Sequence, residues 1–385
     1  MTVIDTTTDL QDLCVLLRKS DYVTLDTEFL RDKTYFPKLC LVQLSAPGED
    51  AVAVDPLADD LDLGPLKALL TDPDVTKVFH AARQDLEIFY NHFGIVVDPI
   101  FDTQVAAMVC GYGDSVGYQR LVQDICKAEL DKAHQFTNWA YRPLSDKQLQ
   151  YALDDVIYLK DIYESLWARL KTQERDRWVR EEMAILTDPE TYEIRPEESW
   201  QRLKLKNTKP KTLAAAQKLA AWREEQAMRK NIPRAWVLKD DTLADLAQRS
   251  PKAAKDLKRI RNFPSVDHDS WLARAVLDAL DDARKMNNKD IPEKEDKPYV
   301  GPENAAVFEM LKMLLRIKAA ENDVAGRLIA TQDEMKILAV EEEPDIKPLK
   351  GWRREIFGED ALALKRGEIG LSLKDGEIVI SKTNG

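Results

Sequence analysis

The stretch LDTEF at residues 25–29 decides how the N-terminal part of the chain is interpreted. The apolar run YVTL at residues 22–25 leads into it and predicts a β-strand. Side chains two residues apart on a strand point to the same face, so we expect Asp26 and Glu28 to stand side by side. Two adjacent carboxylates repel each other, whereas a divalent cation such as Mg²⁺ or Mn²⁺ neutralises both. The alternative is a strand end at the surface, where both acids simply face water.

Length and composition restrict the class of protein. The chain has 385 residues, which suggests two or three domains, and 32% of them are charged. No segment approaches the ~20 apolar residues that cross a membrane, and no secretory signal is predicted. The four cysteines and four histidines are scattered, which argues against a structural zinc site. Reduced thiols in a cytoplasmic protein are the simplest interpretation.

The charge is unevenly distributed along the chain. Residues 1–200 carry 20 basic and 37 acidic side chains, residues 201–290 carry 21 and 12, and residues 291–385 carry 15 and 19. A basic segment between two acidic ones is typical of a module that binds a polyanion. A well-solvated helical domain would show the same charge.

The pattern of apolar residues predicts a mixed α/β domain followed by helices. We expect strands at 22–28, 39–44, 51–54, 75–79 and 96–100, and helices at 9–19, 64–70, around 86–93 and over most of 102–180. The first three of these strands have short connections and predict an antiparallel meander. The later strands alternate with helices.

Two proline-containing polar runs, 187–212 and 287–302, divide the rest of the chain. The predicted domains are therefore 1–190, a linker 191–211, a helical domain 212–287, a linker 288–302 and a helical module 303–385. Alternation of apolar and polar residues around Asp375-Gly376 predicts a hairpin near the C-terminus.

Further acids could join the first pair. Asp85 lies in the first turn of a predicted helix, where the helix dipole alone would favour an acid. Tyr151 and Asp155 are four residues apart and share one helix face, a spacing that is also common in ordinary amphipathic helices. Taken together, four carboxylates can hold two divalent ions roughly 4 Å apart and so support displacement at a phosphodiester.

These motifs resemble the DEDD superfamily of 3′→5′ exonucleases, in its tyrosine-bearing branch. The matching stretches are LDTEF, HAARQD at 80–85 and YALDD at 151–155. Four further stretches resemble the bacterial ribonuclease D family: RDKTYFPKLCLVQ at 31–43, FDT at 101–103, LDK at 130–132 and WAYRPL at 139–144. Residues 212–285 resemble an HRDC domain, including RKNIP at 229–233 and TLADL at 242–246. Residues 300–385 are similar to the second, more divergent HRDC-like domain of that family.

The resemblance implies a ribonuclease H-like exonuclease domain with a mixed sheet and flanking helices, followed by two all-α HRDC-type bundles. It implies a 3′→5′ exoribonuclease that releases nucleoside 5′-monophosphates and trims tRNA precursors and other small structured RNAs; a monomer is the default expectation. Asp26, Glu28, Asp85 and Asp155 would bind two Mg²⁺ or Mn²⁺ ions. We expect Asp26 to be shared between the ions, Glu28 and Asp155 to complete the first site, and Asp85 to hold the second ion, directly or through water. Tyr151 would orient the attacking water, because a pKa near ~10 makes tyrosine a poor base.

The basic HRDC segment would hold RNA through its phosphates, which gives affinity without sequence choice. The candidate residues are Arg202, Lys204, Lys206, Lys209, Lys211, Arg229, Lys230 and Arg234. The alternative is that HRDC surfaces mainly pack against the nuclease domain. Two other functions fit the same sequence: a DNA 3′→5′ exonuclease, and a non-catalytic RNA-binding adaptor on a degenerate nuclease fold.

Overall fold

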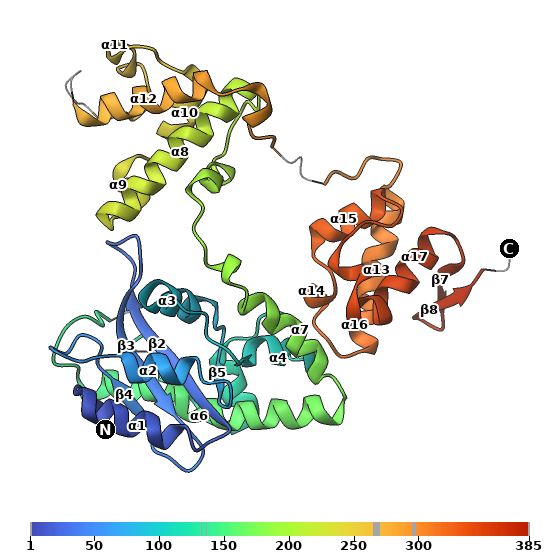
Figure 1. The fold of residues 1–385 in the computed structure, drawn as a ribbon. Coiled ribbons are helices and arrows are strands. Elements are labelled where there is room, and N and C mark those ends of the chain that lie inside the picture. Colours follow the sequence, from blue (N-terminus) through green and yellow to red (C-terminus); the bar gives the residue numbers. More distant parts are fainter. Residues whose placement is uncertain (1, 132, 136, 265–269, 295–297, 384–385) are drawn as a thin grey trace. The chain divides into compact units, whose positions relative to one another are not determined.

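The computed structural model describes residues 2–131, 133–135, 137–264, 270–294 and 298–383, and it divides the chain into two compact units (Figure 1). The first comprises Met1–Glu28, Leu41–Thr191 and Lys297–Gly385. The second comprises Phe29–Cys40 and Tyr192–Asp296. Nowhere in the described part of the chain is a helix long and apolar enough to cross a membrane.

A six-stranded mixed sheet forms the centre of the N-terminal part, in the order β1-β4-β3-β2-β5-β6. Its strands are β1 (Val3–Ile4), β2 (Tyr22–Leu30), β3 (Lys38–Ser45), β4 (Val52–Val54), β5 (Thr76–Phe79) and β6 (Ile100–Asp102). β3 and β4 pair antiparallel, whereas β5 pairs parallel with both β2 and β6, and β1 pairs parallel with β4. The mixed sheet that the sequence predicts is thus present.

The helices of this part are α1 (Thr7–Leu17), α2 (Gly64–Leu70), α3 (Arg83–Phe93), α4 (Thr103–Val109), α5 (Tyr118–Leu121), α6 (Asp146–Thr172) and α7 (Asp176–Leu186). A π-helical turn, Val122–Cys126, follows α5. α3 ends at Gly94, whose positive φ of 66° closes the helix as expected. α6 begins with a capping box between Ser145 and Gln148.

The strands of the structure differ from the predicted ones in two places. The strand expected at 96–100 begins only at Ile100, directly after Pro99, whose missing N–H cannot join a strand ladder. The two-residue β1 was not predicted, because a segment of that length shows no alternation. Its pairing with β4 is a tertiary contact that the local pattern does not contain.

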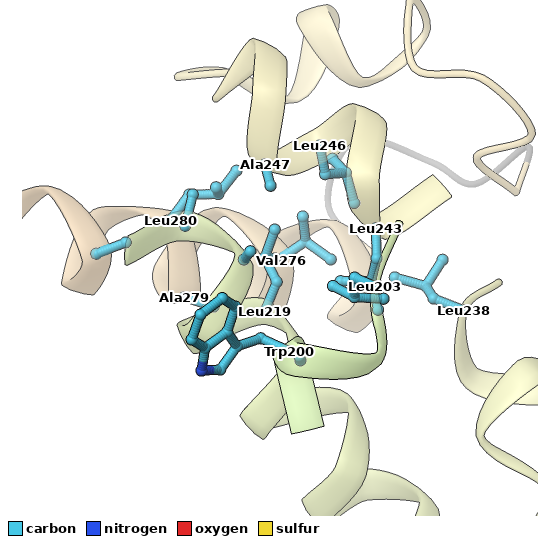
Figure 2. Close-up of a cluster of buried hydrophobic side chains, with 14 of the residues drawn as sticks. Trp200, Leu203, Leu219, Leu238, Leu243, Leu246, Ala247, Val276, Ala279 and Leu280 are labelled. Carbon is cyan, nitrogen blue, oxygen red and sulfur yellow. The ribbon is translucent and has the colours of Figure 1, made fainter. Parts of the chain in front are cut away.

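The second unit is helical apart from the segment Phe29–Cys40. Its helices are α8 (Pro210–Lys230), α9 (Arg234–Val237), α10 (Asp240–Arg249), α11 (Ala254–Leu257) and α12 (Trp271–Lys285), with 3₁₀ turns at Pro196–Arg202 and Asn288–Asp290. Leu219, Leu243 and Val276 from three of the helices meet in its core (Figure 2). Trp200 and Leu203 also lie in this core, so part of the predicted linker 191–211 packs with the helices.

The C-terminal module contains α13 (Ala305–Glu321), α14 (Gly326–Ile329), α15 (Gln332–Val340), α16 (Gly351–Arg353) and α17 (Glu359–Lys365), with a π-helical turn at Arg354–Gly358. It then ends in an antiparallel hairpin of β7 (Ile369–Lys374) and β8 (Glu377–Lys382). The prediction of an all-α module is therefore wrong for its last segment, where residue alternation outweighs helix propensity. The hairpin predicted around Asp375-Gly376 is confirmed, with positive φ at both turn residues.

This C-terminal module belongs to the same compact unit as the nuclease sheet. Trp352 of α16 stacks on Trp178 of α7, with ring centroids 4.4 Å apart and an interplanar angle of 11°. The next residue, Arg353, forms a buried ion pair with Glu182 of α7. α7 is thereby part of the contact between the nuclease helices and the C-terminal helices.

Candidate active site

Three carboxylates from β2 and α6 converge at one place. Ligand oxygens of Asp26, Glu28 and Asp155 all lie within 4.8 Å of one another, and all three residues are half-buried. Asp26 and Glu28 are brought together by the two-residue period of β2. Asp155 comes from the third turn of α6, more than a hundred residues further along the chain. The side-by-side placement of Asp26 and Glu28 is thus present in the structure.

Asp85 joins this group through Thr27. It is buried in the first turn of α3, where the helix dipole favours an acid. The hydroxyl of Thr27, which lies between the two acids of β2, donates a hydrogen bond of 2.5 Å to Oδ1 of Asp85. Asp85 therefore has a direct partner on the strand that carries Asp26 and Glu28.

The turn before α3 is held by Asp102, at the end of β6. Its carboxylate accepts hydrogen bonds from the backbone N–H groups of Ala81 and Ala82, at 3.0 and 2.9 Å. It also caps α4 by accepting from the N–H of Gln104 at 2.8 Å. Asp102 thus fixes the chain immediately ahead of Asp85. The sequence singled out the FDT stretch at 101–103 but assigned no role to its aspartate.

The acids of the site perturb one another strongly. Burial, followed by the nearby carboxylates, raises the pKa of Glu28 to about 9. Burial raises the pKa of Asp85 to about 7, with the hydrogen bond from Thr27 acting in the opposite direction. Burial and the charges of Asp154 and Asp85 raise the pKa of Asp155 to about 7, and the pKa of Asp26 is raised by burial and its three acidic neighbours.

This donor set fits a divalent cation. Clustered carboxylate oxygens are hard ligands of the kind that Mg²⁺ and Mn²⁺ prefer. Their raised pKa values show that the folded chain alone does not compensate their charge. A bound cation removes this repulsion and keeps the carboxylates ionised. We conclude that the protein uses divalent metal.

A pocket of about 380 Å³ adjoins Asp155. Tyr151, Asp154 and Asp155 of α6 line it. From other segments come Gly117, Tyr118, Gln119, Arg120, Leu130, Asp131 and Gln135. Burial and the charge of Asp155 raise the pKa of Tyr151, so its hydroxyl stays protonated at neutral pH.

Thr27 and Tyr118 are residues of this region that the sequence did not identify. The hydroxyl of Tyr118 donates to the backbone carbonyl of Asp154 at 3.0 Å, which orders the pocket wall beside Asp155. Neither residue has a charge or a spacing that distinguishes it from an ordinary core residue. Only the tertiary contact reveals its place.

The predicted RNA-binding residues fall into separate groups within the second unit. Arg202, Lys204 and Lys206 line one pocket of about 400 Å³, together with Arg261 and three aspartates of α10. Lys209 and Lys211 are exposed at the start of α8.

The remaining three candidates lie at the other end of α8 and engage neighbouring side chains. Arg229 contacts Gln226, and the ammonium of Lys230 lies 4.0 Å from the ring centroid of Trp271. Arg234, just beyond α8, pairs with Glu224 at 2.9 Å. The eight candidates therefore do not form one continuous set of free cations.

Comparison with known proteins identifies the family. Residues 1–171 match the family model described as a 3′-5′ exonuclease, and residues 212–267 match that of the HRDC domain. Over 369 residues the chain is 46% identical to ribonuclease D of Nitrobacter hamburgensis, with 96% of each chain covered. The chain belongs to the ribonuclease D family.

Other ribonuclease D proteins agree with this identification. The ribonuclease D of Acidiphilium cryptum is 46% identical over 367 residues, covering 95% of this chain and 93% of that protein. The crystal structure of Escherichia coli RNase D, an exoribonuclease involved in structured RNA processing, matches with a TM-score of 0.81 at 28% identity. That match covers 94% of this chain and 98% of the other. The protein is a 3′→5′ exoribonuclease with an HRDC domain.

Proposed function

We propose that Asp26, Glu28, Asp85 and Asp155 hold two divalent ions and form the catalytic site. The reaction is hydrolysis of the terminal phosphodiester, which releases nucleoside 5′-monophosphates from an RNA 3′ end. One observation carries this assignment: acids from β2 and α6 place their oxygens within 4.8 Å, with Asp85 attached through Thr27. Two ions at such a site supply charge at both the attacking and the leaving oxygen and lower the pKa of a bound water.

The chain's own residues position the reactants. The carboxylate of Asp26 lies within 4.8 Å of those of Glu28 and Asp155, and the charge of Asp85 also raises its pKa, which supports a shared role for it. Thr27 donates to Oδ1 of Asp85 and so fixes the orientation of that carboxylate. Tyr151, kept protonated, orients the attacking water through its hydroxyl and does not remove its proton.

The pocket beside the acids suits the last nucleotide of the RNA. It presents the aromatic side chains of Tyr118 and Tyr151 and the cation of Arg120 next to Asp155. Aromatic rings accept any base by stacking, and an arginine can contact a phosphate. A site of this kind removes nucleotides one at a time without choosing among sequences.

We further propose that the HRDC unit holds the body of the substrate, with the pocket lined by Arg202, Lys204 and Lys206 as its main phosphate contact. These side chains are exposed, and only Arg202 approaches a described acid, Glu224, at 4.0 Å. The aspartates opposite are engaged by their own unit: Asp240 pairs with Arg223 at 2.6 Å, and Asp245 with Arg249 at 2.7 Å. Substrates with structure near the 3′ end, such as tRNA precursors and other small structured RNAs, fit such an arrangement. The C-terminal helices α13 to α17 are assigned as a divergent second HRDC-like module, and the enzyme as a monomer.

The test uses a 5′-labelled tRNA precursor and a DNA of matched sequence, with Mg²⁺, with Mn²⁺ and with chelator. The wild type should shorten only the RNA from its 3′ end, and only with metal. Asp26→Asn and Asp155→Asn should abolish shortening, whereas Asp161→Asn, an exposed acid further along α6, should not. Near-normal activity of either site variant would refute the assignment, and equal degradation of DNA would favour the DNA exonuclease. Inactivity of the wild type under every condition would favour the RNA-binding adaptor.

A further inference from the structure

The metal-binding strand runs directly into the second unit. β2 extends to Leu30 and β3 begins at Lys38, but the chain from Phe29 to Cys40 belongs to the compact unit that contains the HRDC helices. The boundary therefore falls immediately after Glu28. The loop at residues 31–37 joins the two strands within the HRDC unit.

This loop is bound at the C-terminal end of α8. The side-chain oxygen of Asn231 accepts hydrogen bonds from the N–H groups of Tyr35 and Phe36, at 3.1 and 3.0 Å. Asn231 itself adopts a left-handed conformation, with φ of 46°, and closes α8. Asn231 thus ends the helix through its backbone conformation and binds the loop through its side chain.

The loop also completes a buried polar cluster. The hydroxyl of Tyr35 donates to the carboxylate of Glu224, which is 1% exposed in α8. Arg234 pairs with the same carboxylate at 2.9 Å, and its guanidinium lies 5.6 Å from the centroid of the Tyr35 ring. Burial and Glu224 raise the pKa of Tyr35, which keeps the hydroxyl a donor. A buried carboxylate requires such partners, so the loop is a specific part of this cluster.

We propose that residues 31–37 form a latch that ties the HRDC unit to the strand carrying Asp26 and Glu28, with Tyr35 and Asn231 as positioning residues for RNA held by that unit. Tyr35 follows Glu28 by seven residues, a length that spans at most about 25 Å when fully extended. A closed latch therefore limits the range over which RNA on the HRDC unit can move from the metal ligands. This limit raises the effective concentration of the 3′ end at the active site. The inference rests on the proposed RNA binding by the HRDC unit.

The latch can be opened without removing a catalytic group. Asn231→Gly deletes the acceptor of both loop hydrogen bonds, while glycine keeps the left-handed helix end. Tyr35→Phe deletes only the hydroxyl that reaches Glu224. The matched control is Ser250→Gly, because Ser250 ends α10 of the same unit with φ of 42° and makes no loop contact that the structure describes.

Hydrogen exchange of the full-length protein reports whether the latch opens. Compared with the wild type, amides of the peptide covering residues 31–38 should exchange faster in Asn231→Gly and in the double variant Asn231→Gly/Tyr35→Phe. Their exchange rate should be unchanged in Ser250→Gly. Equal exchange in the wild type and the double variant would show that no latch exists.

Kinetics with two substrates report what the latch does. For a structured RNA we expect KM of the double variant to rise about tenfold with kcat unchanged, the order of effect when effective concentration falls. For a dinucleotide, which offers the HRDC unit no further phosphate once its single phosphodiester is in the active site, neither constant should change. An unchanged KM for the structured RNA, or an equal loss with the dinucleotide, would overturn the proposal. Failure of the proposed active site would appear separately, as an Asp155→Asn variant that still shortens RNA, and would leave the exchange comparison valid.

Discussion

Replacement of Trp352 by alanine should destabilise the nuclease part of the enzyme as well as the C-terminal helices. The indole of Trp352 is 1% exposed and stacks on Trp178 of α7 at 4.4 Å. Its neighbour Arg353 donates to the carbonyl of Leu328 at 2.6 Å and pairs with Glu182. The substitution therefore leaves a cavity between α7 and α16, within one compact unit.

The size of the effect follows from the burial. Truncation of a buried tryptophan to alanine costs about 3–5 kcal/mol, a range that includes the ~0.5–1.5 kcal/mol of an aromatic pair. No hydrogen bond adds to this cost, because the indole N–H of Trp352 has no partner in the described structure. For a unit of this size each kcal/mol lowers Tm by roughly 2–4 °C, so a decrease of roughly 6–20 °C is expected.

The assay must separate the two units, because a chain with two units does not unfold in a single transition. Hydrogen exchange at increasing urea concentration separates them, because each peptide reports the unfolding of its own unit. Peptides from β5 and α3 report on the nuclease, and peptides from α8 and α10 report on the HRDC unit. The nuclease and C-terminal peptides should lose protection together at lower urea, while the HRDC peptides stay unchanged. Trp236→Ala is the matched control: that side chain is 62% exposed in α9, and its loss should cost less than about 0.5 kcal/mol.

Two results would contradict this reasoning. A loss of less than about 1 kcal/mol for Trp352→Ala would mean that the stacked pair is not a packed contact. Loss of protection confined to the C-terminal peptides would mean that this module unfolds independently of the nuclease sheet.

Three further outcomes are expected. In chelator, Asp155→Asn should stabilise the protein above pH 7 by at most about 4 kcal/mol and have little effect near pH 4. The pKa of Asp155 is raised from 3.8 to about 7, so the carboxyl costs the folded state nothing below pH 3.8, increasingly more between these two values, and the full amount above pH 7. Urea unfolding at the two pH values checks this, and equal shifts at both would contradict it. Tyr151→Phe should lower kcat at least about tenfold while the rise in Tm on adding Mn²⁺ stays as in the wild type; loss of that rise would instead make the tyrosine part of the metal site. Lys204→Glu combined with Lys206→Glu should weaken RNA binding and reduce the slope of log K against log salt by about 0.7 for each phosphate that the protein no longer neutralises. Titration at several salt concentrations measures this slope, and an unchanged slope would exclude these residues from the interface.

The sequence predicted most elements of the nuclease domain because its strands and helices have clear periods. The two-residue period of β2 places Asp26 beside Glu28, and the four-residue spacing on α6 places Tyr151 and Asp155 on one helix face. Gly94 marks the end of α3 because glycine takes a positive φ readily. Each of these inferences depends on residues close together in the chain, where local geometry restricts the outcome.

Packing between distant segments explains what could not be predicted. Trp200 belongs to the HRDC core although it lies in a polar, proline-containing run, because burial depends on partners far along the chain. The final hairpin was predicted from its alternation, yet the class of its module was assigned as all-α, because the helices around it dominate the composition.

The sequence alone thus determined that Asp26 stands beside Glu28, the class of chemistry, and that an exonuclease domain precedes an HRDC domain. The tertiary structure decided that Thr27 holds Asp85, that the C-terminal helices share a unit with the nuclease sheet, and that the loop after Glu28 belongs to the HRDC unit. The physical reason is that these contacts join residues 58 to about 200 positions apart. The packing of the whole chain decides which apolar or polar groups meet over such separations, and no local period in the sequence encodes this choice.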